Sequence, residues 1–311
     1  MDGRQPGLVL SPLVSIRWGS SMKLQSTAPY GKMKRTAETF RVFSNWPTVM
    51  AQTILTQSIF GQNGKGAKVV TFITRDGLKI KCPNRREARS PVYDVFGENC
   101  YQLSWFLQPF GGRPIHAIDI GGHIGAFACQ LAQIYPGATV ESFEASPVTA
   151  NYLRDNVTQN GFGDRVSVSQ VALAAESGWV FLEDNGEAGC ENSLVSEQGA
   201  EQSATSTRVP ALSFDEVVNA SPHPVDFVKM DCEGAEYDLV FGSSPASWKS
   251  VDRVVLEYHP VSGHSWSELS QWFAQAGLEV VRHEPWIGQA GLGLAWLARS
   301  GSDSPGTPGS S

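Results

Sequence analysis

The segment IHAIDIGGHIG, residues 115–125, decides the fold class of this chain. Its first six residues have the pattern of a buried strand, and the residues after the glycines, 124–135, have that of a helix. A strand that turns through glycines into a helix is the usual opening unit of a parallel sheet. Glycines there let the chain turn tightly, and the first helical turn offers free backbone N–H groups to a ligand.

The alternation of short apolar runs and helical segments continues to about residue 299. Further strands are expected at residues 139–143, 166–173, 225–230, 251–257, 278–281 and 293–297, and helices at 147–160 and 267–276. This order predicts an α/β, doubly wound fold whose mostly parallel, seven-stranded sheet carries helices on both faces. Ligands bind such sheets beyond the carboxyl ends of the strands, so functional residues are expected directly after each strand.

Composition and pattern divide the chain into four segments. They are a disordered leader, an N-terminal helical and hairpin region, the sheet domain and a disordered tail, at residues 1–25, 26–110, 111–299 and 300–311. Asp76-Gly77 between apolar runs signals the hairpin, which gives the N-terminal region α+β character. Met22 is an alternative start to Met1.

Charge and cysteine content restrict the class of protein. A net charge of −7 argues against a protein that holds nucleic acid by neutralising phosphates, and favours a small-molecule substrate. The five cysteines are scattered and form neither a disulfide framework nor a zinc motif, which favours reduced thiols in a cytoplasmic enzyme. No apolar run is long enough to span a membrane.

The glycine loop and the end of the second strand favour a nucleoside cofactor. The loop has D-x-G-x-x-x-G spacing from Asp119 to Gly125. This spacing suits S-adenosylmethionine, whereas loops that bind dinucleotides usually have G-x-G-x-x-G. A plain strand-to-helix turn is the alternative. Glu144, at the end of the second strand, can accept hydrogen bonds from a ribose diol, and an adenine ring would lie along residues 170–173.

Carboxylates gather after the fourth and fifth strands. The segment KMDCEGAE, residues 229–236, brings Lys229 and Asp231 onto one face of a strand. Glu257 and His259 share one side of the next strand. Because these strands and the first are expected to be neighbours, Asp231, Glu257 and His259 are predicted to surround one pocket.

These motifs together resemble the FkbM family of S-adenosylmethionine-dependent methyltransferases. The resemblance rests on DIGGHIG, FEASP with LRDNVTQNG, VKMDCEGAEYDLV and LEYHP, and it extends from about residue 90 to 281, with the stretch 93–101 included. It implies the Rossmann-like class I methyltransferase fold and an O-methyltransferase that acts on a hydroxyl of a sugar, polyketide or other small metabolite. The Gly/Ser/Glu-rich loop at residues 183–206 departs from the family and is expected to be a lid or an edge insertion.

The resemblance and the strand-end reasoning together give the candidate site. Cofactor contacts are expected from Asp119, Gly121, Gly122, His123, Gly125, Glu144, Ala145, Ala172 and Asp231. Catalytic roles are expected from Asp231, His259, Glu257 and Lys229, with Asp231 or His259 as the base that accepts the hydroxyl proton. Alternatively, Mg2+ held by Asp231, Glu257 and His259 would acidify the hydroxyl.

Two other functions remain open at this stage, a nicotinamide-dependent oxidoreductase and a non-catalytic binding module of the same fold. The first accounts for the glycine loop and Glu144 but gives the acids at residues 231–236 no task. Five aromatic residues are candidates for an apolar acceptor site, although such residues are more often core: Trp105, Phe106, Trp179, Trp266 and Trp286.

Overall fold

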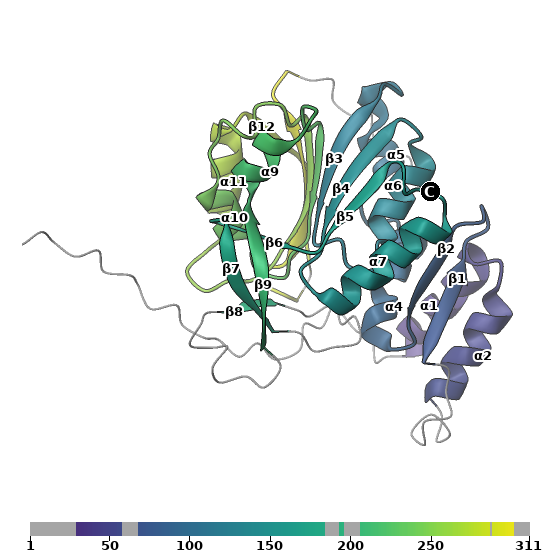
Figure 1. Cartoon of the computed structure of the whole chain (residues 1–311). Helices are drawn as coiled ribbons and strands as arrows, with labels where there is room; N and C mark the ends of the chain where they lie inside the picture. Colours follow the sequence, from purple (N-terminus) through teal and green to yellow (C-terminus); the bar gives the residue numbers. More distant parts are fainter. Residues whose placement is uncertain (1–28, 58–67, 184–192, 196–205, 287, 302–311) are drawn as a thin grey trace, which may run out of the picture.

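A seven-stranded sheet forms the centre of the computed structural model, which describes residues 29–57, 68–183, 193–195, 206–286 and 288–301 (Figure 1). Its strands are β3 (Ile115–Ile120), β4 (Ala138–Phe143), β5 (Val166–Ser169), β10 (Phe227–Met230), β11 (Arg253–Tyr258), β12 (Leu278–Pro285) and β13 (Gly293–Arg299). They lie in the order β12-β13-β11-β10-β3-β4-β5. The pairs from β5 to β11 are parallel, and only β13 runs against its neighbours β11 and β12. The predicted fold class and the adjacency of β3, β10 and β11 are confirmed.

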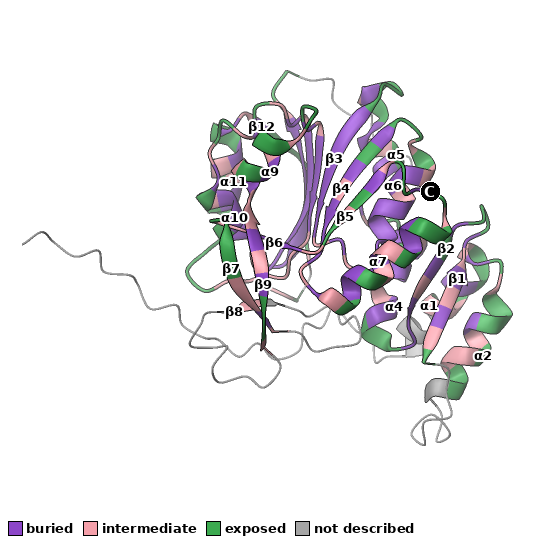
Figure 2. Cartoon of the chain, in the orientation of Figure 1, coloured by how far each residue is buried: buried purple, intermediate pink, exposed green. Residues whose placement is uncertain are grey.

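Helices cover both faces of this sheet (Figure 1). One face carries α6 (Ala126–Ile134) and α7 (Pro147–Gln159), and the other carries α9 (Phe214–Ala220), α10 (Glu236–Gly242) and α11 (Trp266–Gln275). Side chains of β10 alternate between two buried clusters, because Phe227 packs with α6 whereas Val228 and Met230 pack under α10 and α11. The strands β3, β10 and β11 at the centre of the sheet are therefore buried along their whole length, whereas β4, β5 and β12 are partly exposed, as Figure 2 shows for β3 to β5.

The N-terminal region packs on the α7 side of the sheet. Its elements are α1 (Pro29–Val42), α2 (Trp46–Gln57), β1 (Val69–Ile73), β2 (Lys79–Pro83), α4 (Arg86–Val92), the π-helical turn η1 (Tyr93–Gly97), α5 (Leu103–Phe106) and the 3₁₀ turn η2 (Gln108–Phe110). The predicted hairpin is confirmed, since β1 and β2 pair antiparallel. Asn156 of α7 exchanges hydrogen bonds with Lys81 of β2 and also donates to the carbonyl of Ile124. One buried side chain thus joins the hairpin to the glycine loop.

The prediction of a single strand at residues 166–173 is wrong. The chain leaves the main sheet after β5, and β6 (Ala172–Ala174) belongs to a separate four-stranded sheet with β7 (Gly178–Glu183), β8 (Ser193–Val195) and β9 (Ser206–Ser213). Its strand order is β6-β9-β7-β8. β6 and β8 have only three residues each, and β9 has Pro210 inside it, so the period of these strands is too weak to predict them from the sequence. Most of the predicted loop at 183–206 lies outside the described residues.

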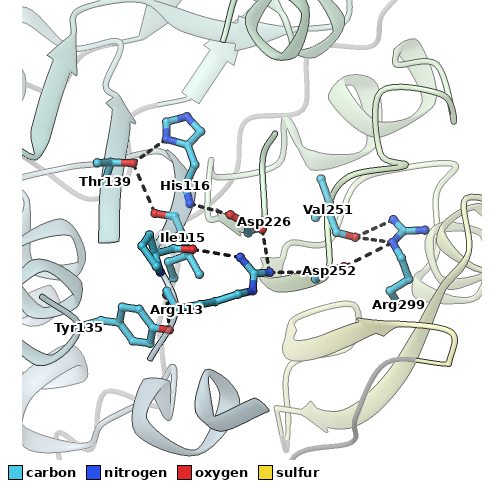
Figure 3. A network of polar contacts seen from close by, with 10 residues as sticks. Arg113, Ile115, His116, Tyr135, Thr139, Asp226, Val251, Asp252 and Arg299 are labelled. Carbon is cyan, nitrogen blue, oxygen red and sulfur yellow. Dashed lines mark hydrogen bonds and ion pairs between the residues drawn. The ribbon is translucent and has the colours of Figure 1, made fainter. Parts of the chain in front are cut away.

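A network of ion pairs joins the strands at their amino ends (Figure 3). Arg113 pairs with Asp226 at 2.9 Å and with Asp252 at 3.1 Å, and so links the chain ahead of β3, β10 and β11. Asp226 also accepts a hydrogen bond from the backbone N–H of His116, whose ring contacts Thr139 of β4. This edge of the sheet, which we call the amino edge, is closed by paired charges.

The remaining observations concern the segment ahead of α5, the ends of the chain and membrane-spanning helices. The chain is not helical between η1 and α5, where Asn99 and Gln102 adopt the left-handed conformation. The predicted leader and nearly all of the predicted tail fall outside the described residues. Within the described part of the chain, no helix has both the length and the apolar character needed to cross a membrane.

Candidate active site

A cavity of about 120 Å³ lies at the carboxyl ends of β3, β4 and β10. This is where a doubly wound sheet binds its ligands. Eight of the residues predicted for the site line it: Gly121, Gly122, His123, Glu144, Ala145, Ala172, Lys229 and Asp231. The structure thus brings these eight residues together around one cavity.

The glycine loop lies against the segment that follows β10. Gly121 has φ +74°, and a Cβ added there would come within 1.9 Å of the carbonyl oxygen of Asp231. A Cβ on Gly122 would lie 2.2 Å from the Oγ atom of Ser142. Only glycine fits at Gly121, because backbone fills that side of the loop. A Cβ on Gly122 would instead displace the side chains of Ser142 and Leu153. The opposite side of the loop faces the cavity.

Glu144 stands at the wall of the cavity with both carboxylate oxygens already engaged. It accepts hydrogen bonds from the backbone N–H groups of His123 and Ser146, each at 2.8 Å. These bonds fix the carboxylate, yet each oxygen retains a lone pair for a further donor. Burial raises the pKa of Glu144 to about 7, and the two N–H bonds oppose that rise.

Asp119 and Lys229 lie behind the glycine loop and support it. Lys229 pairs with Asp119 at 3.3 Å and donates hydrogen bonds to the carbonyl oxygens of Gly121 and Ile120. Burial works against the charge of Lys229, but Asp119 and Asp231 outweigh it and raise the pKa of the lysine above its ordinary value. Lys229 is therefore a fixed cation. Asp119 is fully buried and, like Gly125, does not line the cavity.

Glu236 organises the turn between β10 and α10. Its fully buried carboxylate accepts hydrogen bonds from the backbone N–H groups of Cys232 and Gly234, each at 3.0 Å. Between them, Glu233 adopts a left-handed conformation with φ +53°, which is unusual for a residue with a side chain. The turn presents Asp231, Cys232 and Glu233 to the cavity.

His259 lies among three carboxylates. Its Nδ1 atom is 3.0 Å from Glu236, and its Nε2 atom is 3.4 Å from Glu233 and 3.7 Å from Glu257. Burial opposes a charged ring, but Glu236 and Glu233 raise the pKa of His259 well above its ordinary value. The imidazole is therefore protonated at neutral pH and balances part of this acidic cluster.

The predicted grouping of Asp231, Glu257 and His259 is present in the structure. Each of the three offers one possible metal-ligand atom, and these atoms all lie within 4.8 Å of one another. Asp231 reaches the cavity, whereas Glu257 and His259 are buried behind it. The three side chains thus meet as predicted, but only one of them faces the ligand space.

Sequence reasoning missed the wall of the cavity that comes from outside the parallel sheet. Pro91, Val95 and Tyr101 approach from the N-terminal region, and Leu182 and Leu194 from the four-stranded sheet. The only signal for Val95 and Tyr101 is the stretch 93–101, which the family resemblance includes without a role. None of the five aromatic candidates lines the cavity. Phe106, for example, is fully buried in the core, and Trp179 is 60% exposed.

Comparison with known proteins gives one family match and three similar proteins. Residues 119–280 match the family described as the methyltransferase FkbM domain. Methyltransferase sdnD of Sordaria araneosa is 25% identical over 220 residues, which are 62% of this chain and 83% of that protein. The 31-O-demethyl-FK506 methyltransferase FkbM of Streptomyces tacrolimicus is 26% identical over 223 residues, 63% of this chain and 84% of that protein.

A tRNA1(Val) (adenine(37)-N6)-methyltransferase of Porphyromonas gingivalis shares a shorter stretch. It is 38% identical over 61 residues, which are 20% of this chain and 24% of that protein.

Proposed function

This chain belongs to the FkbM methyltransferase family and uses S-adenosylmethionine, and we propose that it methylates a hydroxyl oxygen of a small, uncharged metabolite such as a sugar or polyketide. The family match covers residues 119–280 of 311, just over half of the chain. Membership excludes the nicotinamide-dependent oxidoreductase considered from the sequence. The relatives include one whose name specifies O-demethylated FK506 as the acceptor, which supports oxygen as the methylated atom.

The cavity residues fit S-adenosylmethionine. Glu144 would accept hydrogen bonds from the ribose diol through its remaining lone pairs, since its present bonds already fix its orientation. Backbone groups of Gly121 and Gly122 would face the methionine part, and Ala145 and Ala172 would flank the adenine. When bound, S-adenosylmethionine supplies a methyl group on a sulfonium, which makes that methyl open to in-line attack by an oxygen.

Asp231 is the base that the geometry supports best. Its position in the cavity wall is the single observation that carries the proposal. Its carboxylate lines the cavity beside the glycine loop, where a hydroxyl must lie to attack the methyl group. As the oxygen–carbon bond forms and the sulfur–carbon bond breaks, the hydroxyl proton would pass to Asp231. The alternatives are less suitable, because Lys229 and His259 already hold their protons.

The charge of the cavity supports an uncharged acceptor. Glu144, Asp231 and Glu233 line it, and among the described lining residues the cations offer little to a phosphate, because Lys229 is engaged by Asp119 and backbone carbonyls. A phosphorylated molecule would therefore lose hydration on entering the cavity and find no available cation among these lining residues. We therefore propose that nucleic acid is not the acceptor, and the likeness to a tRNA methyltransferase extends over only a fifth of the chain.

The division of the chain and its location are part of the same proposal. We assign methyl transfer to residues 111–299 and the acceptor-side wall to residues 26–110, because Pro91, Val95 and Tyr101 line the cavity opposite the sheet. The free thiols of Cys82, Cys129 and Cys232 support a reducing, cytoplasmic setting.

Mg2+ is the alternative partner for Asp231, Glu257 and His259. A metal needs the neutral imidazole, whereas the contacts of both ring nitrogens with carboxylates favour the protonated form. We therefore propose that the imidazolium, rather than a metal ion, balances these acids. Turnover unchanged after dialysis against EDTA is the expected result, and a loss that Mg2+ alone restores would overturn this part of the proposal.

Transfer of a radiolabelled methyl group tests the acceptor class. The panel contains a macrolide polyketide, a methyl glycoside and a sterol, each paired with the same compound whose hydroxyls are already methylated. Label is expected in at least one free hydroxyl compound and in none of the blocked ones, with Asp231→Asn far less active than the wild type. Equal labelling of blocked compounds, or transfer to a transfer RNA alone, would contradict hydroxyl methylation of a small metabolite.

A further inference from the structure

Tyr101 occupies the cavity wall on a turn that is held in an unusual conformation. The residues on either side of it along this turn, Asn99 and Gln102, have φ values of +51° and +49°, which residues with side chains rarely adopt. Such strained positions persist only where surrounding structure fixes them, and they are concentrated at functional sites. The surroundings of Tyr101 therefore show what the turn is held for.

The last two strands of the sheet hold this turn in place. The indole Nε1 of Trp296, in β13, donates a 2.9 Å hydrogen bond to the carbonyl oxygen of Tyr101. Arg282, in β12, donates at 2.7 Å to the side-chain oxygen of Gln102 and lies over the rings of Trp105 and Trp296. Contacts from residues about 180 positions later in the chain thus set the backbone of Tyr101.

The side chain of Tyr101 is equally constrained. Its ring meets Phe127 edge-on, with centroids 5.3 Å apart, and its hydroxyl donates a 3.1 Å hydrogen bond to Oδ2 of Asp231. Burial and the charge of Asp231 raise the pKa of Tyr101 well above its ordinary value, so the phenol remains a donor. One oxygen of the proposed base is thereby engaged, which fixes how the carboxylate lies beside the glycine loop.

Building on the proposed function, we propose that Tyr101 is a positioning residue for methyl transfer. Its hydroxyl holds one oxygen of Asp231 so that the other faces the point where the transferred methyl group and the acceptor hydroxyl meet. The clamp of Trp296 and Arg282 sets Tyr101, and through it Asp231. Tyr101 thus acts on the reaction through Asp231 and gives the N-terminal region a defined part in it.

A pair of cofactor analogues tests this without knowledge of the acceptor. Sinefungin carries an ammonium group where S-adenosylmethionine carries its methyl, whereas S-adenosylhomocysteine has no charge there. A carboxylate aimed at that point favours sinefungin, and the ratio of the two dissociation constants reports its aim. Both are measured by calorimetry for the wild type, Tyr101→Phe, Asp231→Asn and the double variant.

The wild type is expected to prefer sinefungin by about tenfold or more, as for a hydrogen bond between charged groups. Asp231→Asn should remove the preference, Tyr101→Phe should reduce it at least about threefold, and the double variant should equal Asp231→Asn. Tyr93→Phe is the matched control, because it also removes a buried hydroxyl but one bonded to Thr39. Arg282→Met, which loosens the clamp from outside the cavity, should give a smaller reduction than Tyr101→Phe.

The possible failures separate the two proposals. If Asp231→Asn removes the preference and Tyr101→Phe retains all of it, the positioning role is wrong and Asp231 remains the base. If the wild type shows no preference, or Asp231→Asn keeps it, both assignments fall. An equal reduction in Tyr93→Phe would mean general loosening and would also overturn the positioning role.

Turnover provides a second readout with the acceptor found in the methyl-transfer panel. Tyr101→Phe is expected to lower kcat while KM for S-adenosylmethionine changes little, because the hydroxyl orients the base and does not hold the cofactor. A merely structural role would instead change both constants together with thermal stability.

Discussion

Charged side chains are arranged differently at the two ends of the strands of the central sheet, the amino edge and the opposite end, which we call the carboxyl edge. At the amino edge, Asp226 and Asp252 share Arg113, and their side chains remain 16% and 34% exposed (Figure 3). At the carboxyl edge, Glu144, Glu236 and Glu257 are buried, and the cations available to the acids there are Lys229 and His259, which are buried as well.

The needs of folding explain the paired charges at the amino edge, but they do not explain the buried charges at the carboxyl edge. Paired, partly solvated charges lose little solvation on folding, whereas buried acids lose much of it, as the raised pKa values of Glu144 and Glu233 show. Groups with such shifts gather at sites of binding and catalysis. The comparison therefore indicates that the amino edge holds the strands together and the carboxyl edge serves the ligand.

The largest expected difference between the edges is in turnover. Asp231→Asn should lower kcat by about 10²- to 10⁴-fold, because it removes the base, while affinity for S-adenosylhomocysteine changes little. Asp252→Asn makes the same chemical change at the amino edge and should leave kcat unaltered. Steady-state kinetics with the acceptor from the panel measures both, and equal activity of the two variants would remove the proposed contrast.

A second pair of variants concerns stability. His259→Gln should lower the free energy of unfolding by about 3 kcal/mol near neutral pH, since it leaves the buried Glu236 without its cation. His116→Gln, whose partner Glu141 is 27% exposed, should cost about 1 kcal/mol. Urea denaturation of both variants and the wild type gives these values.

The loss of stability in His259→Gln depends on pH in a direction that can be stated. Because the pKa of His259 is raised in the folded protein, its stabilisation is complete below its unfolded value of about 6.5 and is lost as pH rises through the folded value. The gap between wild type and His259→Gln should therefore narrow at alkaline pH. A gap that widens there would mean that the histidine is neutral in the folded protein.

Cofactor affinity gives the third contrast. Glu144→Gln should weaken S-adenosylhomocysteine binding about tenfold, because the charged acceptor for the ribose is lost. Wild-type affinity should rise as pH increases through about 7, where Glu144 ionises, and the variant should lack this rise. Glu141→Gln, three residues earlier and inside β4, should bind like the wild type. Calorimetry from pH 6 to pH 8 (about one unit on either side of the Glu144 pKa) checks all three.

The smallest effect is expected at Arg113. Its guanidinium is nearly half exposed, so solvent screens its two ion pairs, and Arg113→Ala should cost about 0.5–1 kcal/mol of stability. The kcat of this variant should equal that of the wild type. A large loss of activity would mean that the amino edge is coupled to the site and would break the comparison.

What the sequence predicted follows from local pattern. Period and punctuation are enough to find the parallel strands, and strand ends are enough to find Glu144 and Asp231, because the fold places ligands there. Lys229 shows the limit of prediction from local pattern. Its position beside Asp231 was predicted, but its partner is Asp119, which lies opposite it in the register of β10 and β3.

The remaining features depend on contacts between distant segments. The charge of His259 follows from Glu233, in the turn after β10, and from Glu236, at the start of α10. Tyr101 meets Asp231 across 130 positions of sequence. No periodicity encodes such meetings. Likewise, β6 and β7 depend on pairing with β9, and β8 depends on pairing with β7, rather than on their own pattern.

A crystal structure of the complex with S-adenosylhomocysteine tests the central claim most directly. We expect both ribose hydroxyls to donate to Glu144 and the sulfur to face the carboxylate of Asp231 across the glycine loop. A ligand whose ribose lies away from Glu144, or whose sulfur points away from Asp231, would contradict the assignment of the carboxyl edge as the site of methyl transfer.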